Sequence, residues 1–246
     1  MIKISEDMKT RCYKGQKNAL GLMPGPKWTC PNATTGEGGC WNVREGRKLE
    51  TCYVTHCLAR RPNVTAALTH NTELIYSVKG KNQVDLLAEA FHAFQTKELK
   101  RDDPQLYFRL HWSGDIYDSE YASSLSKAID QFPQIKFWMY TRSFQYINVF
   151  RKLRNLSLYL SLDRQNFTEG LKTYNMYKWP HLKICYLSPE DDWQKQFQKM
   201  KDEVSEDIKP VGCPADIGKI GLEESCAKCR ICLRNGRKTH VWFKTK

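Results

Sequence analysis

Four cysteines near the carboxyl end of this chain constrain its fold more than any other feature. Cys213 is followed by proline, and a Cys-x2-Cys-x2-Cys run comprises Cys226, Cys229 and Cys232. Thiols this close together cannot all form disulfides without strain, but all of them can ligate one inorganic core. This spacing, with a separate Cys-Pro, is typical of the ligands of a 4Fe–4S cluster. Structural zinc sites more often have two separated ligand pairs, so zinc is the alternative.

The composition indicates a globular protein of a reducing compartment. The chain has 246 residues, of which 41% are hydrophobic and 27% charged, so it can form a substantial core. It has no apolar run long enough to span a membrane, and its first residues include acidic side chains and no apolar signal core. We therefore expect a cytoplasmic location, reduced thiols and no membrane partner. Ten cysteines in such a compartment favour metal binding over disulfides.

The chain is also strongly basic. Its net charge is +12, from 39 Lys and Arg against 27 Asp and Glu. A surplus of this size favours phosphate-bearing partners, so nucleic acid is a candidate partner. A basic surface that serves only solubility explains the charge almost equally well. Nothing in the sequence indicates an oligomeric state.

Hydrophobic periodicity predicts alternating strands and helices in the middle of the chain. Residues 84–94 place apolar side chains on one helical face, and residues 156–163 alternate as a strand does. Strands that alternate with helices imply parallel β/α units. The expected strands are 106–112, 137–141, 156–163, 183–187 and 239–244, and the expected helices are 84–94, one beginning at Asp118 or Ser119, 144–153, and one beginning at Ser188.

The strand at 156–163 predicts a sheet with two different faces. Its four leucines would meet the helices, and the polar residues between them would point into an interior. A polar interior is expected of a partial, open parallel β/α barrel with a substrate cavity. The alternative is a flat sheet with one solvated face. We divide the chain into a barrel domain, 1–205, and a cysteine-rich segment, 206–246. The residues expected to face inward are Ser157, Tyr159, Ser161 and Asp163, together with Arg109 and His111.

A looser set of cysteines lies in a Gly- and Pro-rich stretch near the amino end. Cys30, Cys40 and Cys52 have irregular spacing, and Cys57 follows them. If the first three hold a 4Fe–4S cluster, one iron stays open for a ligand. If Cys57 joins them, the cluster is closed. Cys185 lies inside an expected strand, and we interpret it as a small buried side chain.

Polar residues follow three of the expected strands. Ser113, Gly114 and Asp115 follow the first strand, Arg142 the second and Asp163 the third. The carboxyl ends of barrel strands meet at one edge, where catalytic groups gather. Gly114 permits close backbone approach, and Asp115 can accept hydrogen bonds from a ligand amine. We therefore predict that these five residues form a ligand site.

Together these motifs resemble the phage-encoded gene-product-88 proteins. The resemblance rests on Cys30-Pro with Cys40 and Cys52, on Arg-Leu-His-Trp-Ser-Gly-Asp-Ile-Tyr at 109–117, and on Phe-Trp-Met-Tyr-Thr-Arg-Ser at 137–143. More distantly, the layout is similar to that of radical S-adenosylmethionine enzymes. Those enzymes have a three-cysteine loop before a partial β/α barrel and a Gly-Gly-Glu-like motif that binds the methionine amine. Here the cysteines are further apart than the C-x3-C-x2-C of that family, and an aspartate replaces the glutamate.

The distant resemblance implies a radical-SAM-type barrel with two clusters. The amino-terminal cysteines would bind a cluster that chelates S-adenosylmethionine, and the predicted ligand site would hold cofactor and substrate. The carboxyl-terminal cysteines would bind an auxiliary cluster, an electron donor would be needed, and a phage protein would work in the host cytoplasm. The leading hypothesis is therefore an iron–sulfur enzyme acting on a nucleotide or nucleic-acid substrate. Two alternatives stay open: a non-catalytic module, stapled by iron–sulfur or zinc, that binds nucleic acid or a host protein, and a single cluster shared by both cysteine loops.

Overall fold

The protein is an α/β structure built on one open sheet of six parallel strands. The computed structural model describes residues 1–35, 39–41, 52, 54, 61–188, 193–203, 209–233 and 239–244. The strand order is β1-β2-β3-β4-β6-β5, and every neighbouring pair is parallel. This confirms the predicted parallel α/β class and the open sheet. The strands are β1 Tyr107–Arg109, β2 Lys136–Thr141, β3 Leu156–Leu162, β4 Leu182–Ser188, β5 Lys209–Gly212 and β6 Thr239–Lys244.

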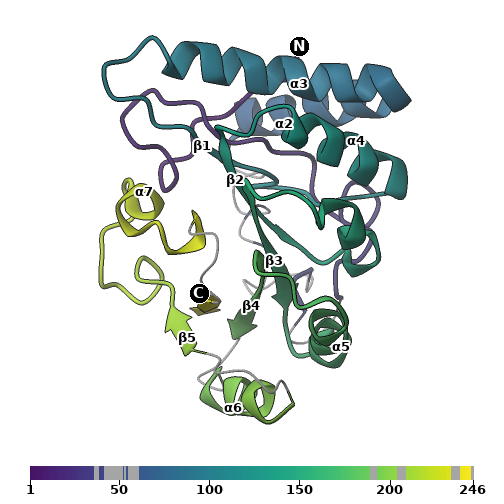
Figure 1. Cartoon of the computed structure of the whole chain (residues 1–246), viewed down its shortest axis with the longest axis vertical. Helices are drawn as coiled ribbons and strands as arrows, with labels where there is room; N and C mark the ends of the chain where they lie inside the picture. Colours follow the sequence, from purple (N-terminus) through teal and green to yellow (C-terminus); the bar gives the residue numbers. More distant parts are fainter. Residues whose placement is uncertain are drawn as a thin grey trace.

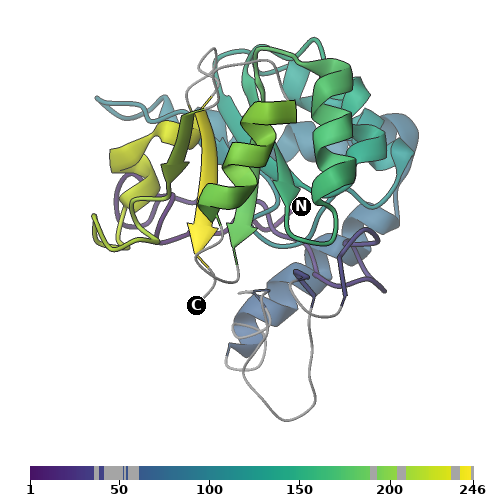
Figure 2. The same ribbon diagram turned by 90° about the horizontal axis from the view of Figure 1, so that it is seen from below.

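Helices cover one face of this sheet, and the segment 225–233 lies on the other (Figure 1). Figure 2 shows α5 and α6 side by side on the helical face, where Lys199 of α6 lies 5.4 Å from the ring centre of Phe167 of α5. None of the described helices is long and apolar enough to cross a membrane. The helices are α2 Pro62–Tyr76, α3 Gly80–Glu98, α4 Ser119–Asp130, the 3-10 helix η1 Phe144–Phe150, α5 Phe167–Tyr177, α6 Trp193–Glu203, α7 Ser225–Cys229 and the 3-10 helix η2 Ile231–Leu233.

Most of the predicted elements are present, with different ends. Helix α4 begins after Asp118, whose side chain accepts a hydrogen bond from the backbone of Tyr121, as the expected cap requires. The stretch expected to be helical at 144–153 is a shorter 3-10 helix. The helix expected to begin at Ser188 is α6, which is described from Trp193. Residues 189–192 lie outside the described part of the chain.

Strand β3 has the two faces that its alternation predicts. Leu156, Leu158, Leu160 and Leu162 are fully buried in the large core beneath the helices. The residues between them point the other way, where Tyr159 packs with Cys185 of β4 and Val241 of β6. We call this side of the sheet the polar face. Its members include Ser157, Tyr159, Ser161, Lys183 and Cys185.

His111 does not point to the polar face, so that expectation was wrong. The strand ends two residues earlier, and His111 has a φ of 50°, in the left-handed region. This turn breaks the alternation and directs the ring toward α4, where Nε2 lies 2.8 Å from the hydroxyl of Tyr121. Arg109 follows the prediction, because its guanidinium lies 5.8 Å from the ring centre of Tyr140.

Both ends of the chain are tied to the sheet. Residues 18–22 run beside β1, with the Leu20 amide donating to Arg109 and the Trp112 amide donating to Leu20, both at 2.9 Å. The turn at residues 7–11, which we call the amino-terminal turn, also holds α7. The amides of Glu224 and Cys226 donate to the carbonyls of Met8 and Lys9 at 2.8 Å. Strands β5 and β6 extend the sheet from β4, so the carboxyl-terminal residues complete it.

Candidate cluster and ligand sites on the polar face

The carboxyl-terminal cysteines converge on the polar face. Cys213 directly follows β5, Cys226 and Cys229 lie in α7, and Cys232 lies in η2, which packs against β2 and β6. The fold therefore places Cys213 and Cys226 within electrostatic range of Cys232, and Tyr159 lies within range of both Cys232 and Cys229.

The spacing of these thiols bears on what they can hold. Among the described residues, no three His, Cys, Asp or Glu side chains lie close enough together to hold a single metal ion. A tetrahedral zinc ion draws all its ligands onto one atom. In a cubane cluster each thiolate binds a different iron atom, so the sulfur atoms stand further apart.

The surroundings of Cys232 are rich in polar groups directed at sulfur. Burial raises the pKa of the Cys232 thiol to about 12, and a hydrogen bond from the Tyr140 hydroxyl acts in the opposite direction. Tyr159 also forms a hydrogen bond with Cys232. Hydrogen bonds to cluster sulfurs and the surrounding charge set the potential of an iron–sulfur centre. Cys232 therefore lies in an environment that can tune such a centre.

A buried lysine completes these surroundings. Lys183 is fully buried on β4, its Nζ donates to Ser157 Oγ at 2.9 Å, and it lies 5.1 Å from the ring centre of Tyr159. Burial lowers the pKa of Lys183 to about 8, whereas the neighbouring Cys232 acts to raise it. The ammonium group is thus held inside the protein next to a predicted cluster ligand.

The amino-terminal cysteines gather at the carboxyl ends of the strands. The chain at Thr29 is fastened to Asp115, whose amide donates to the Thr29 carbonyl at 3.1 Å, and Cys30 comes next. Cys30 is within electrostatic range of Asp115, Cys52 and Cys40. The three predicted ligands are therefore neighbours of one another and of the predicted ligand site. Cys57 lies outside the described residues.

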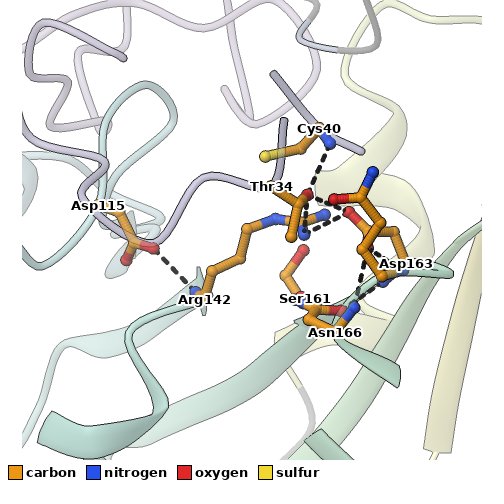
Figure 3. A network of polar contacts seen from close by, with 8 residues as sticks. Thr34, Cys40, Asp115, Arg142, Ser161, Asp163 and Asn166 are labelled. Carbon is orange, nitrogen blue, oxygen red and sulfur yellow. Dashed lines mark hydrogen bonds and ion pairs between the residues drawn. The ribbon is translucent and has the colours of Figure 1, made fainter. Parts of the chain in front are cut away.

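Arg142 and Asp163 form a buried ion pair at this edge (Figure 3). Arg142 Nη1 donates to Asp163 Oδ2 at 2.6 Å and to Thr34 Oγ1 at 3.1 Å. Thr34 Oγ1 in turn donates to Asp163 at 2.5 Å and accepts from the Cys40 amide at 2.9 Å. The network joins the ends of β2 and β3 to the loop that carries Cys40. Two predicted site residues, Arg142 and Asp163, are thus in direct contact. Thr34, which the sequence analysis did not select, bonds to both of them.

Asp115 links the same strand ends to the Cys30 loop. Its carboxylate accepts from Thr141 Oγ1 at 2.6 Å, from the Ile116 amide at 2.7 Å and from the Arg142 amide at 2.8 Å. Burial raises its pKa to about 6, against the effect of these hydrogen bonds. These three internal donors use three of the roughly four acceptor sites of the carboxylate, two on Oδ1 and one on Oδ2.

Ser113 and Gly114, the other two predicted site residues, position the loop that carries Cys30. Ser113 donates its hydroxyl to the Leu22 carbonyl at 2.7 Å. Gly114 has a φ of 79°, and a Cβ on it would come within 2.4 Å of Thr29 Oγ1. Glycine is required here because the backbone must approach the Cys30 loop closely in a left-handed conformation.

Sequence reasoning missed the contributions of Lys183, Tyr140 and Thr34, although it expected Tyr159 to face inward. The signal for Lys183 was available, since a lysine interrupts an otherwise apolar strand at 182–187. No signal marks Tyr140 or Thr34, because the register of β2 and the path of the loop decide what each of them touches.

Comparison with known proteins identifies relatives along nearly the whole chain. The sequence model of the family described as Gene product 88 matches residues 3–235. The "Gene 88 protein" of Mycobacterium phage D29 is 31% identical over 245 residues, covering 94% of this chain and 89% of that protein. The "Gene 88 protein" of Mycobacterium phage L5 is 30% identical over 239 residues, with the same coverage. No solved structure matches the chain.

Proposed function

This chain belongs to the Gene product 88 family of phage proteins, and we propose that Cys213, Cys226, Cys229 and Cys232 bind a 4Fe–4S cluster. The observation that carries the proposal is the convergence of these thiols around Cys232. Hydrogen-bonding hydroxyl groups and a buried ammonium group lie beside it. A cluster with four thiolates is anionic, and these groups suit an anionic centre.

The surrounding residues would isolate such a cluster from water and stabilise its charge. A 4Fe–4S cluster supplies one-electron transfer when it is bound. Tyr140 provides a hydroxyl donor and Lys183 provides a cation on the same face. Tyr159 provides ring surface, and its hydroxyl donates to the Thr239 carbonyl at 3.3 Å. Four protein ligands leave no iron open, so this site fits electron transfer or structural support. The reduced thiols that it needs are expected in the host cytoplasm.

The second part of the proposal concerns Cys30, Cys40 and Cys52. Their proximity to one another and to Asp115 supports a second, three-cysteine cluster at the strand ends. By the distant resemblance, its open iron would chelate S-adenosylmethionine. The Arg142–Asp163 pair and Asp115 would then hold the loop, and polar groups of a ligand would compete for their hydrogen bonds.

Iron and sulfide counts on protein purified without oxygen test the two parts separately. We expect about eight iron and eight sulfide ions per chain for two clusters and about four of each for one. The double variant Cys226→Ser/Cys229→Ser should lose about four iron ions, with its visible absorption reduced accordingly. The matched control is Cys185→Ala, which removes a buried thiol of the same face and should keep the full count.

Other outcomes would overturn each part. Stoichiometric zinc without sulfide, or equal iron loss in Cys185→Ala, would reject the carboxyl-terminal cluster. For the amino-terminal part, Cys30→Ser/Cys40→Ser should lose its own share of iron. Reduced protein with S-adenosylmethionine should release 5′-deoxyadenosine only when these two cysteines are present. A full iron count in that variant, or no release from fully loaded protein, would reject the amino-terminal part alone.

A further inference from the structure

A basic groove opens at the edge of the sheet opposite the predicted ligand site. It has a volume of about 880 Å³ and lies between the turn after η1 and the turn after α5. These turns precede β3 and β4, so the groove lies at the amino ends of these strands, whereas Asp163 and its partner Arg142 follow the carboxyl ends of β3 and β2. The distance between the two edges is about 20 Å for a strand of this length. The groove is therefore separate from the polar network in Figure 3.

Positive charge dominates the groove. Its lining includes Arg151, Lys152, Arg154 and Lys178, and none of the described residues that line it is acidic. Within the described part of the chain, Arg151, Lys152 and Lys178 take part in no ion pair. Arg151, Lys152 and Lys178 lie around one hollow and repel one another, and a bound polyanion would relieve this repulsion.

One of these cations occupies a position where glycine is usual. Lys178 ends α5 in the left-handed conformation, with φ 45° and ψ 36°. Helices commonly end in this conformation with glycine or asparagine, because a larger side chain costs about 1 kcal/mol there. A lysine in this position therefore lowers the stability of the fold and adds a positive charge to the groove. Backbone strain of this kind is concentrated at functional sites.

Aromatic rings also line the groove. Trp179 is 6% exposed, and its ring lies 5.6 Å from that of His181, nearly parallel at 28°. The half-buried ring of Tyr177 lies 4.9 Å from Trp179. Burial lowers the pKa of His181, which keeps this ring neutral among the four cations. The groove is thus lined by packed aromatic rings as well as by cations.

We propose that this groove, lined by Arg151, Lys152, Arg154, Lys178, Tyr177 and Trp179, binds single-stranded nucleic acid. Cations that track phosphates and rings that stack on bases are the two components of single-strand recognition. Tyr177 is half-buried, so its ring can stack on an unpaired base, while the buried Trp179 packs beside it. The proposal does not depend on the cysteine sites, which use residues of the opposite face and edge.

Fluorescence anisotropy with a labelled single-stranded oligonucleotide tests the proposal. The double variant Arg151→Glu/Lys152→Glu should weaken binding by at least about tenfold in low salt. The slope of log affinity against log salt concentration should become shallower by about 1.4, which is about 0.7 for each lost phosphate contact. The matched control Lys97→Glu/Lys100→Glu makes the same charge change at exposed lysines near the end of α3 and should bind nearly as the parent does. Tyr177→Leu should weaken binding by about fivefold or more without changing the salt dependence.

The remaining comparisons separate nucleic acid from other polyanions. The single strand should bind at least about tenfold more tightly than a duplex of the same sequence or a polyglutamate chain of similar charge. Equal loss of affinity in both charge-reversal variants would reject the groove, because it would show binding by overall charge alone. Equal affinity for polyglutamate, or no effect of Tyr177→Leu, would reject recognition of a nucleic-acid single strand. No binding by the parent protein would reject the proposal entirely.

Discussion

His111 shows how one residue can couple folding to pH. Its imidazole is buried between the end of β1 and α4, and burial lowers its pKa to about 3 from an ordinary value of 6.5. The one neighbouring titratable group bonded to it, Tyr121, has its pKa raised by burial and is neutral over this range. The unfolded chain therefore binds a proton that the folded chain does not, and stability must fall as pH falls from about 6.5 toward 3.

We predict that replacing this histidine flattens the pH dependence of unfolding. Between about pH 7 and pH 5 the parent should lose about 2 kcal/mol through His111 alone. His111→Asn cannot titrate and tolerates the left-handed conformation, so it should lose the Tyr121 contact equally at all pH values. Urea unfolding at several pH values measures the difference in slope. Parallel curves for parent and variant would show that His111 is not the responsible group.

The Arg142–Asp163 pair should be costly to break from either side. Asp163 is fully buried, and Arg142 also holds Thr34 in the loop that carries Cys40. We predict that Arg142→Met destabilises the protein by about 3–5 kcal/mol, since it leaves a buried carboxylate without its cation. The control is Lys79→Met, which removes an exposed ion pair with Asp118 at 3.5 Å and should cost less than about 1 kcal/mol. Similar losses for both, measured by urea unfolding, would contradict this.

At the scale of elements, Gly114 decides how the Cys30 loop meets the sheet. The backbone there approaches Thr29 and Leu22, and residues 18–22 run beside β1 just before this point. Any side chain at Gly114 must push the loop away from the strand ends.

We predict that Gly114→Ala destabilises the protein by at least about 2 kcal/mol, through the close contact and the positive φ together. It should also lower iron retention at Cys30 and Cys40 without changing the carboxyl-terminal share. Gly80→Ala, at a positive φ with no atoms within 4 Å of the new Cβ, separates backbone strain from the contact. The two effects are measured by unfolding and by iron counts in the background of Cys226→Ser/Cys229→Ser. Equal destabilisation by the two substitutions would show that the contact with Thr29 is unimportant.

At the scale of the whole molecule, the amino-terminal turn and the carboxyl-terminal cysteines form one unit. Met8 and Lys9 accept backbone hydrogen bonds from α7, and Arg109 of β1 pairs with Asp7 at 3.0 Å and lies within electrostatic range of Cys226. A cluster bound by these cysteines would therefore fasten both ends of the chain to the sheet.

We predict that iron loading raises the melting temperature and slows hydrogen exchange in both segments, 7–11 and 213–232. A group that binds only the folded chain stabilises it by mass action. Removing iron with a chelator should reverse both effects. The Cys226→Ser/Cys229→Ser variant should respond much less, while Cys185→Ala should behave as the parent does. Protection confined to 213–232 would argue that the two ends are energetically independent.

The helices and strands that carry a periodic pattern could be predicted from the sequence. The four leucines of β3 mark its helical face, the apolar side of α4 is buried as expected, and Thr239–Lys244 is a strand with the predicted ends. Short elements were missed: β5 has four residues and α7 five, too few for a periodic signal. The direction of His111 could not be predicted either, because it depends on a single left-handed residue.

The sequence alone determined the parallel α/β class and the two faces of β3, because periodicity is a local property, and the cysteine spacing predicted which thiols share a site. The tertiary structure decided what surrounds them. It placed Lys183 beside Cys232 and brought Arg142 into contact with Asp163 and Thr34. It also placed the basic turns 151–154 and 177–181 on either side of one groove. These contacts join residues far apart in the chain, and only strand order and register set their distances.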